Sequence, residues 1–207
     1  MSTPLLLKLT SPIHARLRAG RSQMAVDIMQ PARSMSLLDV GGSPGIAGEW
    51  DRLRVLFKNV VVVNRDPDCN VKKPAAPNVT VEIADGCALP YPDRSFDWVF
   101  SNAVLEHVGD RTKQNQFSSE MQRVARVGYF LSTPNKHFFL DPHTYLPFYH
   151  LLPKRLQEIA IHLSPGHMRS WEPLKLVSAR ELREMFPSAH IETSGPLGLN
   201  LIAYGRC

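Results

Sequence analysis

The sequence predicts an α/β fold built on a mostly parallel sheet. Short apolar runs alternate with segments of helical periodicity, and this alternation is typical of strands joined by crossover helices. Val60–Val63 is an uninterrupted run of four valines, as expected of a strand buried on both faces of a parallel sheet. A glycine cluster at 41–45 follows the apolar run 36–40 and precedes a helical pattern, which places a helix N-terminus beside a strand end.

The chain begins with a predicted basic helix. Ser11 and Pro12 suit an N-cap and the first helical position. Apolar residues then recur at helical spacing, at Ile13, Leu17, Met24 and Ile28, and predict a helix over about 12–30, closed by Pro31. Residues 1–34 hold five basic side chains and one acidic side chain, which is +4 of the net charge of +5. We expect a basic arm over 1–34, either a solvated helix face or a contact for nucleic acid or an acidic membrane.

The remaining elements follow in regular order. Strands are predicted at 36–40, 60–63, 79–83, 96–101, 129–132, 189–193 and 199–204. Helices are predicted at about 46–57, 113–127, 154–163 and 179–186. Ser178 and Glu181 have the spacing of a capping box before the last of these helices. Gly195 to Gly198 separates the final two strands and favours a hairpin-like end to the sheet.

Composition narrows the class of protein. The 207 residues and 23.3 kDa fit a single domain over 1–207. A hydrophobic fraction of 43% and a charged fraction of 21% are ordinary for a soluble globular chain, and no apolar run is long enough to predict a membrane span. Three cysteines without CxxC spacing argue against a disulfide framework or a zinc site. We therefore expect a reducing compartment, the cytoplasm, and no metal.

Three segments, in this order and spacing, carry a resemblance to a known family. Leu37–Gly45 (LLDVGGSPG) resembles the first motif of the class I S-adenosylmethionine-dependent methyltransferases. Leu89–Val99 (LPYPDRSFDWV) resembles the approach to that family's fourth strand, and Ser101–Val108 (SNAVLEHV) resembles the segment directly after that strand. The resemblance, to the type 11-like branch, implies a Rossmann-like, mostly parallel seven-stranded sheet. Helices would cover both faces, and a final strand would run antiparallel.

The resemblance also implies a cofactor, S-adenosyl-L-methionine, with S-adenosyl-L-homocysteine as product. Asp39 would bind the methionine ammonium and Asp85 the adenine amino group. Asn64 stands where the family usually has an acid for both ribose hydroxyls, with Asp66 two residues on, and Ser43 replaces the usual middle glycine. The cofactor-binding residues expected are Asp39, Gly41, Gly42, Ser43, Gly45, Asn64, Arg65, Asp85, Gly86, Cys87, Ser101 and Asn102.

The segment 134–153 is rich in proline, histidine and aromatic residues and interrupts the strand–helix pattern after the fifth strand. Loops at the carboxyl ends of parallel strands surround ligands, so we expect this insert to form a lid over the acceptor pocket. His143 is the candidate general base, with Asp141 or Tyr145 to orient it. His107 is the second candidate. For both histidines a structural role, holding a loop or capping a helix, stays open.

These features favour methyl transfer by direct displacement to a small-molecule or glycan-like acceptor. Three alternatives remain open at this stage. One is an RNA methyltransferase that uses the basic arm on phosphates. Another is a non-catalytic domain that keeps the fold and binds a partner. In the third, the arm lies on a membrane that presents a lipid-linked acceptor.

Overall fold

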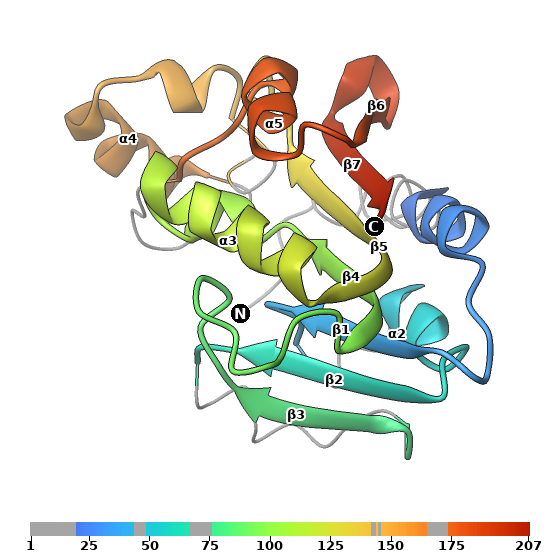
Figure 1. Cartoon of the computed structure of the whole chain (residues 1–207). Coiled ribbons are helices and arrows are strands. Elements are labelled where there is room, and N and C mark those ends of the chain that lie inside the picture. The colour runs from blue at the N-terminus through green and yellow to red at the C-terminus, as the bar shows by residue number, and fades with distance from the viewer. Residues whose placement is uncertain (1–19, 44–48, 67–75, 142–143, 145, 165–173) are drawn as a thin grey trace.

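The computed structural model of the chain describes residues 20–43, 49–66, 76–141, 144, 146–164 and 174–207. One seven-stranded sheet has the order β3-β2-β1-β4-β5-β7-β6 (Figure 1). Its strands are β1 (Ser36–Val40), β2 (Asn59–Asn64), β3 (Val79–Ile83), β4 (Phe96–Asn102), β5 (Ala125–Pro134), β6 (His190–Ser194) and β7 (Asn200–Arg206). Strands β1 to β5 pair in parallel, whereas β7 is antiparallel to β5 and β6. The predicted fold class is confirmed, including the antiparallel last strand.

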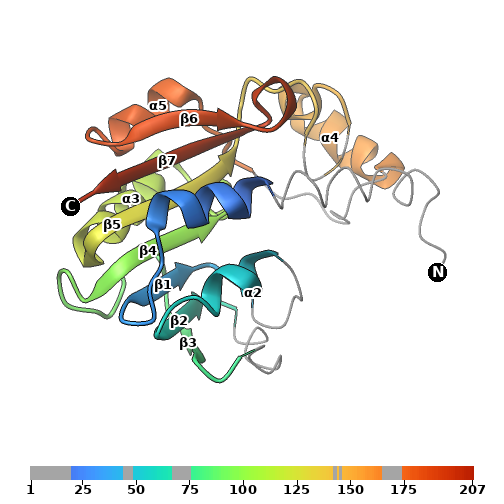
Figure 2. The same cartoon turned by 90° about the vertical axis from the view of Figure 1, so that its right-hand side faces the viewer.

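Helices cover both faces of this sheet (Figure 2). Those described are a helix over 20–29, α2 (Glu49–Arg54), α3 (Arg111–Val124), α4 (Lys154–Ala160) and α5 (Ala179–Met185). The helix over 20–29 and α2 lie on one face, and α3 and α5 on the other. The part of the predicted N-terminal helix that precedes residue 20 lies outside the described residues.

Successive side chains of β1 enter two separate hydrophobic clusters. Leu37 packs with Phe57 and the helix over 20–29, while Leu38 packs with Phe117 of α3. Both leucines are fully buried. Because side chains alternate across a strand, a strand covered by helices on both faces needs an apolar residue at nearly every position.

Helix α3 starts earlier and ends earlier than its sequence pattern predicts. The Asp110 carboxylate accepts a hydrogen bond of 3.0 Å from the backbone nitrogen of Lys113 and caps the helix at its first turn. At the other end Ala125 pairs with Phe96 of β4, so residues 125–127 belong to β5 rather than to the helix. Sheet pairing overrides helical periodicity there. The capping box of Ser178 and Glu181 is present as predicted.

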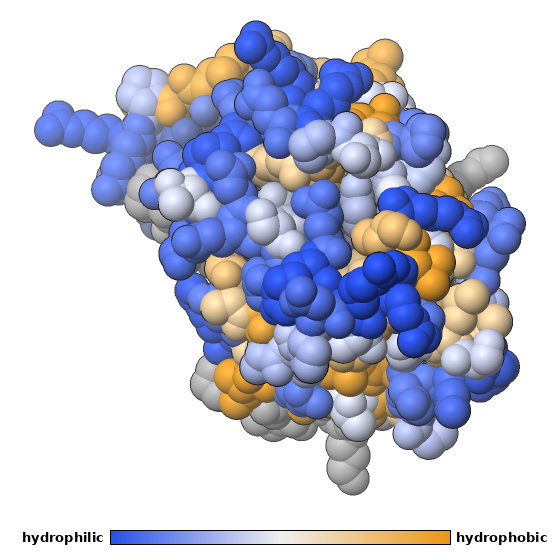
Figure 3. All heavy atoms as spheres, viewed as in Figure 1, coloured by the Kyte–Doolittle hydropathy of each residue, from blue (hydrophilic) through white to orange (hydrophobic). Residues whose placement is uncertain are grey.

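Helix α4 follows the insert and lies beyond the carboxyl ends of β4 and β5 (Figure 2). None of its residues is buried. Its Leu156 and Ile159 are exposed, and Figure 3 shows apolar side chains on the surface in the region of α4, at the upper left. Among the described residues, no helix has the length and apolar character needed to cross a membrane.

A buried carboxylate fastens the start of β1 to β4. Asp97 accepts hydrogen bonds from the backbone nitrogen of Ser36 at 2.8 Å and from its hydroxyl at 3.0 Å, and it also pairs with Arg126. Burial alone would raise the pKa of Asp97, but these donated bonds hold the pKa below its ordinary value. The charged form of Asp97 is therefore the form that stabilises the fold.

We predict that Asp97→Asn lowers the free energy of unfolding by about 1–3 kcal/mol near neutral pH, because it weakens buried charge-assisted bonds. The folded-state pKa is depressed, so the contribution is complete above the unfolded-state pKa of about 3.9. It is lost as the pH falls from there through the folded-state pKa. Urea unfolding of both proteins between about pH 6 and pH 3 should therefore show that the difference in their free energies of unfolding shrinks as the pH falls.

The matched control is Asp93→Asn, whose carboxylate side chain is 75% exposed and pairs with Arg123 at the surface. An exposed pair contributes under about 1 kcal/mol, so this variant should unfold nearly as the wild type does. A difference for Asp97→Asn that stays constant down to about pH 3 would contradict the assignment.

Candidate functional site

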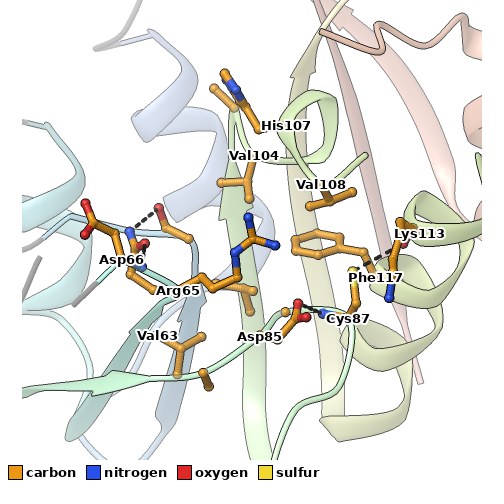
Figure 4. A pocket seen from close by; sticks show the side chains of 16 residues that line it. Val63, Arg65, Asp66, Asp85, Cys87, Val104, His107, Val108, Lys113 and Phe117 are labelled. Atoms are coloured by element: carbon orange, nitrogen blue, oxygen red, sulfur yellow. Dashed lines mark hydrogen bonds between the residues drawn. The ribbon is translucent and has the colours of Figure 1, made fainter. Parts of the chain in front are cut away.

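A cavity of about 510 Å³ opens at the carboxyl ends of the parallel strands. Its wall is built in turn by Gly41 after β1, residues 64–66 at the end of β2, and residues 84–87 after β3. Ala103, Val104, His107 and Val108, which follow β4, close the remaining side together with Lys113 and Phe117 of α3 (Figure 4). This volume lies in the range of small-ligand and cofactor sites.

Two glycines let bare backbone border the cavity. Gly41 has φ of +80°, and a side chain there would collide with Val104. A Cβ atom at Gly86 would lie 2.6 Å from the Phe117 ring and 2.9 Å from Val40. A ligand can therefore approach the peptide groups at both points, as a nucleoside cofactor requires.

The end of β2 joins the glycine turn through Asn64. The Asn64 amide nitrogen donates to the carbonyl oxygens of Gly42 at 2.9 Å and Gly41 at 3.4 Å, and its oxygen accepts from the backbone nitrogen of Asp66 at 3.0 Å. Both ends of the amide thus hold the local backbone. Arg65 and Asp66 are exposed, and Figure 4 shows the Arg65 guanidinium extending into the space between His107 and Asp85.

Asp85 and Cys87 form the floor after β3. The Asp85 carboxylate accepts from the Cys87 backbone nitrogen at 2.9 Å, which turns the chain along the cavity. Burial and the nearby Asp85 carboxylate raise the pKa of the Cys87 thiol to about 11. The thiol is therefore uncharged at neutral pH and serves as a small apolar wall residue rather than as a nucleophile.

Asp39 lies behind the cavity wall, not on it. It is 2% exposed, and its Oδ2 accepts from Arg54 Nε at 2.8 Å and from Arg54 Nη2 at 2.6 Å. Burial raises the pKa of Asp39, and Arg54 partly offsets this. Ser101 is buried as well, and its hydroxyl donates to the Val40 carbonyl at 3.0 Å.

The predicted cofactor residues thus divide into two groups. Those that line the cavity are Gly41, Asn64, Arg65, Asp85, Gly86 and Cys87. Those that support it without reaching the cavity wall are Asp39, Gly42, Ser43, Ser101 and Asn102. Gly45 lies outside the described residues.

His107 also lines the cavity, on the side formed after β4. Its Nε2 lies 4.0 Å from Oε1 of Glu106, which is fully buried. The other oxygen of Glu106 accepts from the Thr133 hydroxyl of β5 at 3.1 Å. His143 lies outside the described residues, and no described residue of 134–153 is part of the cavity wall. The lid function of that insert stays a prediction.

Sequence reasoning missed the apolar part of the wall and the partner of Asp39. Val104 and Val108 lie in the segment that resembled the family. They flank a 3-10 turn, Leu105–His107, whose geometry turns both valines toward the cavity while Leu105 is buried, and the sequence does not reveal this. Phe117 reaches the cavity from α3, where its spacing indicates only a core position. No group of three or more potential metal ligands occurs within the described ranges.

The sheet order, the glycine turn after β1 and the cavity at the carboxyl edge define a Rossmann-like domain with a candidate ligand site at the place where such sheets bind ligands. Residues 38–132 match the family model for a methyltransferase domain. An uncharacterized methyltransferase of Mycolicibacterium paratuberculosis is 35% identical over 105 residues, which cover 48% of this chain and 38% of that protein. The match thus spans well under half of the relative's length.

Solved structures share the fold across nearly the whole chain. An S-adenosylmethionine-dependent methyltransferase from Aquifex aeolicus has a TM-score of 0.61 at 14% identity, with coverage of 100% of this chain and 98% of that one. DhpI in complex with S-adenosylhomocysteine has a TM-score of 0.61 at 18% identity, with coverage of 97% and 86%. Residues 38–132 thus match a methyltransferase domain in sequence, and the chain as a whole has the fold of these solved methyltransferases.

We predict that Gly86→Ala weakens binding of S-adenosylhomocysteine by about tenfold or more. The added methyl group would overlap the Phe117 ring, and such overpacking costs about 1–3 kcal/mol unless the ring moves and changes the shape of the cavity. Calorimetric titration of the purified variant measures this directly. Gly20→Ala is the control, since a Cβ atom there meets nothing within 4 Å. Unchanged affinity in Gly86→Ala would mean that the ligand does not use this cavity.

Proposed function

We propose that the chain transfers the methyl group of S-adenosylmethionine to a small-molecule or glycan-like acceptor by direct displacement. One observation carries the proposal: a single cavity combines bare backbone at Gly41 and Gly86, polar groups at the ends of β2 and β3, and a histidine after β4. The first two features suit a nucleoside cofactor, and the third suits an acceptor that must lose a proton.

The cofactor would lie along the edge formed by β1, β2 and β3. Asp85 would accept from the adenine amino group, and the polar side chains at the end of β2 would meet the ribose hydroxyls. The Asn64 amide bonds the glycine turn, and the exposed Asp66 carboxylate, two residues on, is the second candidate for the ribose hydroxyls. The backbone at Gly41 would border the methionine part. When bound, S-adenosylmethionine supplies an electrophilic methyl group on a positively charged sulfur.

The acceptor would enter on the side formed by Ala103, Val104, Val108 and His107. Three of these side chains are small and apolar, so they leave space and keep water away from the reacting atoms. His107 would take the proton of an alcohol or amine as its oxygen or nitrogen bonds to the methyl carbon. The pair of bonding electrons between that carbon and sulfur would remain on sulfur, which neutralises its charge.

Glu106 would support His107 in this role. Its fully buried carboxyl group has Oε1 4.0 Å from His107 Nε2, so it would help to orient the imidazole. The bond from the Thr133 hydroxyl fixes the opposite oxygen of the carboxylate. We also propose that the insert 134–153, which follows the carboxyl end of β5, covers the acceptor side, with His143 as a second candidate base.

We predict that His107→Gln lowers kcat by about 10²–10⁴-fold on its acceptor, as expected for loss of a general base. Binding of S-adenosylhomocysteine should remain nearly unchanged, because His107 lies on the acceptor side. The assay transfers a labelled methyl group to a panel of small hydroxyl- and amine-bearing acceptors, and titration calorimetry measures the affinity for the product.

His190→Gln is the matched control, because His190 lies on the edge strand β6 and stacks on Tyr204. It should leave the rate unaltered. Equal rates for His107→Gln and wild type would remove the base from the mechanism. Methylation of RNA in place of small acceptors, lost when residues 1–34 are deleted, would replace the proposed acceptor class.

A further inference from the structure

A buried ion pair lies directly beneath the glycine turn. Asp39 is 2% exposed and Arg54 is 5% exposed. Two nitrogens of the guanidinium donate to the same carboxylate oxygen, Asp39 Oδ2, at 2.8 and 2.6 Å. Charge-assisted bonds of this length, shielded from water, are among the stronger polar contacts in a protein.

The third guanidinium nitrogen ties this pair to the turn and to α2. Arg54 Nη1 donates to the Ser43 carbonyl at 3.3 Å and to the Asp51 carboxylate at 2.9 Å. One side chain thus connects the end of β1, the turn and the helix that comes after it. Burial works against the charged form of Arg54, but the Asp39 carboxylate raises the pKa of the guanidinium above its ordinary value.

The backbone of the turn wraps closely around the pair. A Cβ atom on Gly42 would lie 2.7 Å from Arg54 Nη2 and 2.7 Å from each oxygen of Asp39. The Asp39 carboxylate is therefore enclosed by the turn on one side and by Arg54 on the other, and it is absent from the cavity wall. A cationic ligand in the cavity reaches the turn before it reaches this carboxylate.

We infer that Asp39 is a positioning residue neutralised by Arg54, and that it does not bind the ammonium group of the cofactor's methionine part. The pair holds the glycine turn in the shape that receives the cofactor. This inference rests on the proposed function. It replaces the role that the sequence motif assigns to Asp39, and it makes Arg54 a determinant of cofactor binding.

The test is a double cycle that combines a protein change with a ligand change. The ligands are S-adenosylhomocysteine and its analogue without the α-amino group. The proteins are wild type, Asp39→Asn, Arg54→Gln and the double variant, in which both members of the Asp39–Arg54 pair are neutral. Calorimetry gives the factor by which removal of the amine weakens binding in each protein.

We expect this factor to agree within about twofold between wild type and Asp39→Asn, as holds for groups that do not touch. Each single variant should bind S-adenosylhomocysteine more weakly, because the remaining buried charge has lost its partner in the Asp39–Arg54 pair and this disturbs the turn. The double variant should recover part of this loss. The thermal unfolding temperatures should follow the same order as the affinities, and they measure the contribution of the ion pair to stability in the absence of ligand.

Direct recognition of the ammonium by Asp39 would give a different pattern. Removal of the amine would then weaken binding to wild type at least about tenfold more than binding to Asp39→Asn, and this result would overturn the inference. The double variant allows the same comparison if Asp39→Asn does not fold. If folded wild type binds neither ligand, the proposed cofactor is wrong and the inference falls with it.

Discussion

The parallel pairing of β1 with both β2 and β4 is the constraint on which the rest of the site depends. Asp39 stands opposite Val62 on one side and Phe100 on the other. This register makes the three strands end at the same edge, and the backbone nitrogen of Gly41 continues the ladder by donating to the Val63 carbonyl at 2.7 Å. After each of these three strands the chain leaves the sheet at this edge, and the segments that follow the strands form the wall of the cavity.

The polar residues around the glycine turn therefore fall into two sets with different roles. Those that face inward satisfy groups left by the ending strands, as Ser101 does for the Val40 carbonyl and Arg54 for Asp39. Those that face outward, at the ends of β2 and β3, border the cavity. A buried polar group without a partner is costly. The hydrogen bonds of the inward-facing residues must therefore form when the protein folds, before any ligand binds.

The sequence predicted the elements and site residues whose signal is local. The valine run 60–63 lies in β2 as predicted, because a strand buried on both faces accepts mainly apolar residues. The sequence pattern predicted the end of α3 too late because Ala125 pairs with Phe96 of β4, a long-range contact that helical periodicity does not encode. The site divides in the same way. Gly41 could be assigned from a motif because the backbone path fixes its place. The partner of Asp39 could not, since Arg54 lies fifteen residues further on and its contact depends on how α2 packs against β1.

The charge arrangement around the cavity fits the chemistry that we propose. Transfer of a methyl group from a sulfonium to a neutral acceptor moves positive charge toward the acceptor, from which a proton must leave. In the mechanism that we propose, the buried Glu106 carboxyl group, held by Thr133, would lie next to the histidine that takes this proton. At the other end Arg54 pairs with Asp39, so this inward carboxylate would exert little pull on the sulfonium of a bound cofactor. In the proposed mechanism the two ends of the cavity would therefore differ, with a buried carboxylate next to His107 and a neutralised ion pair under the glycine turn.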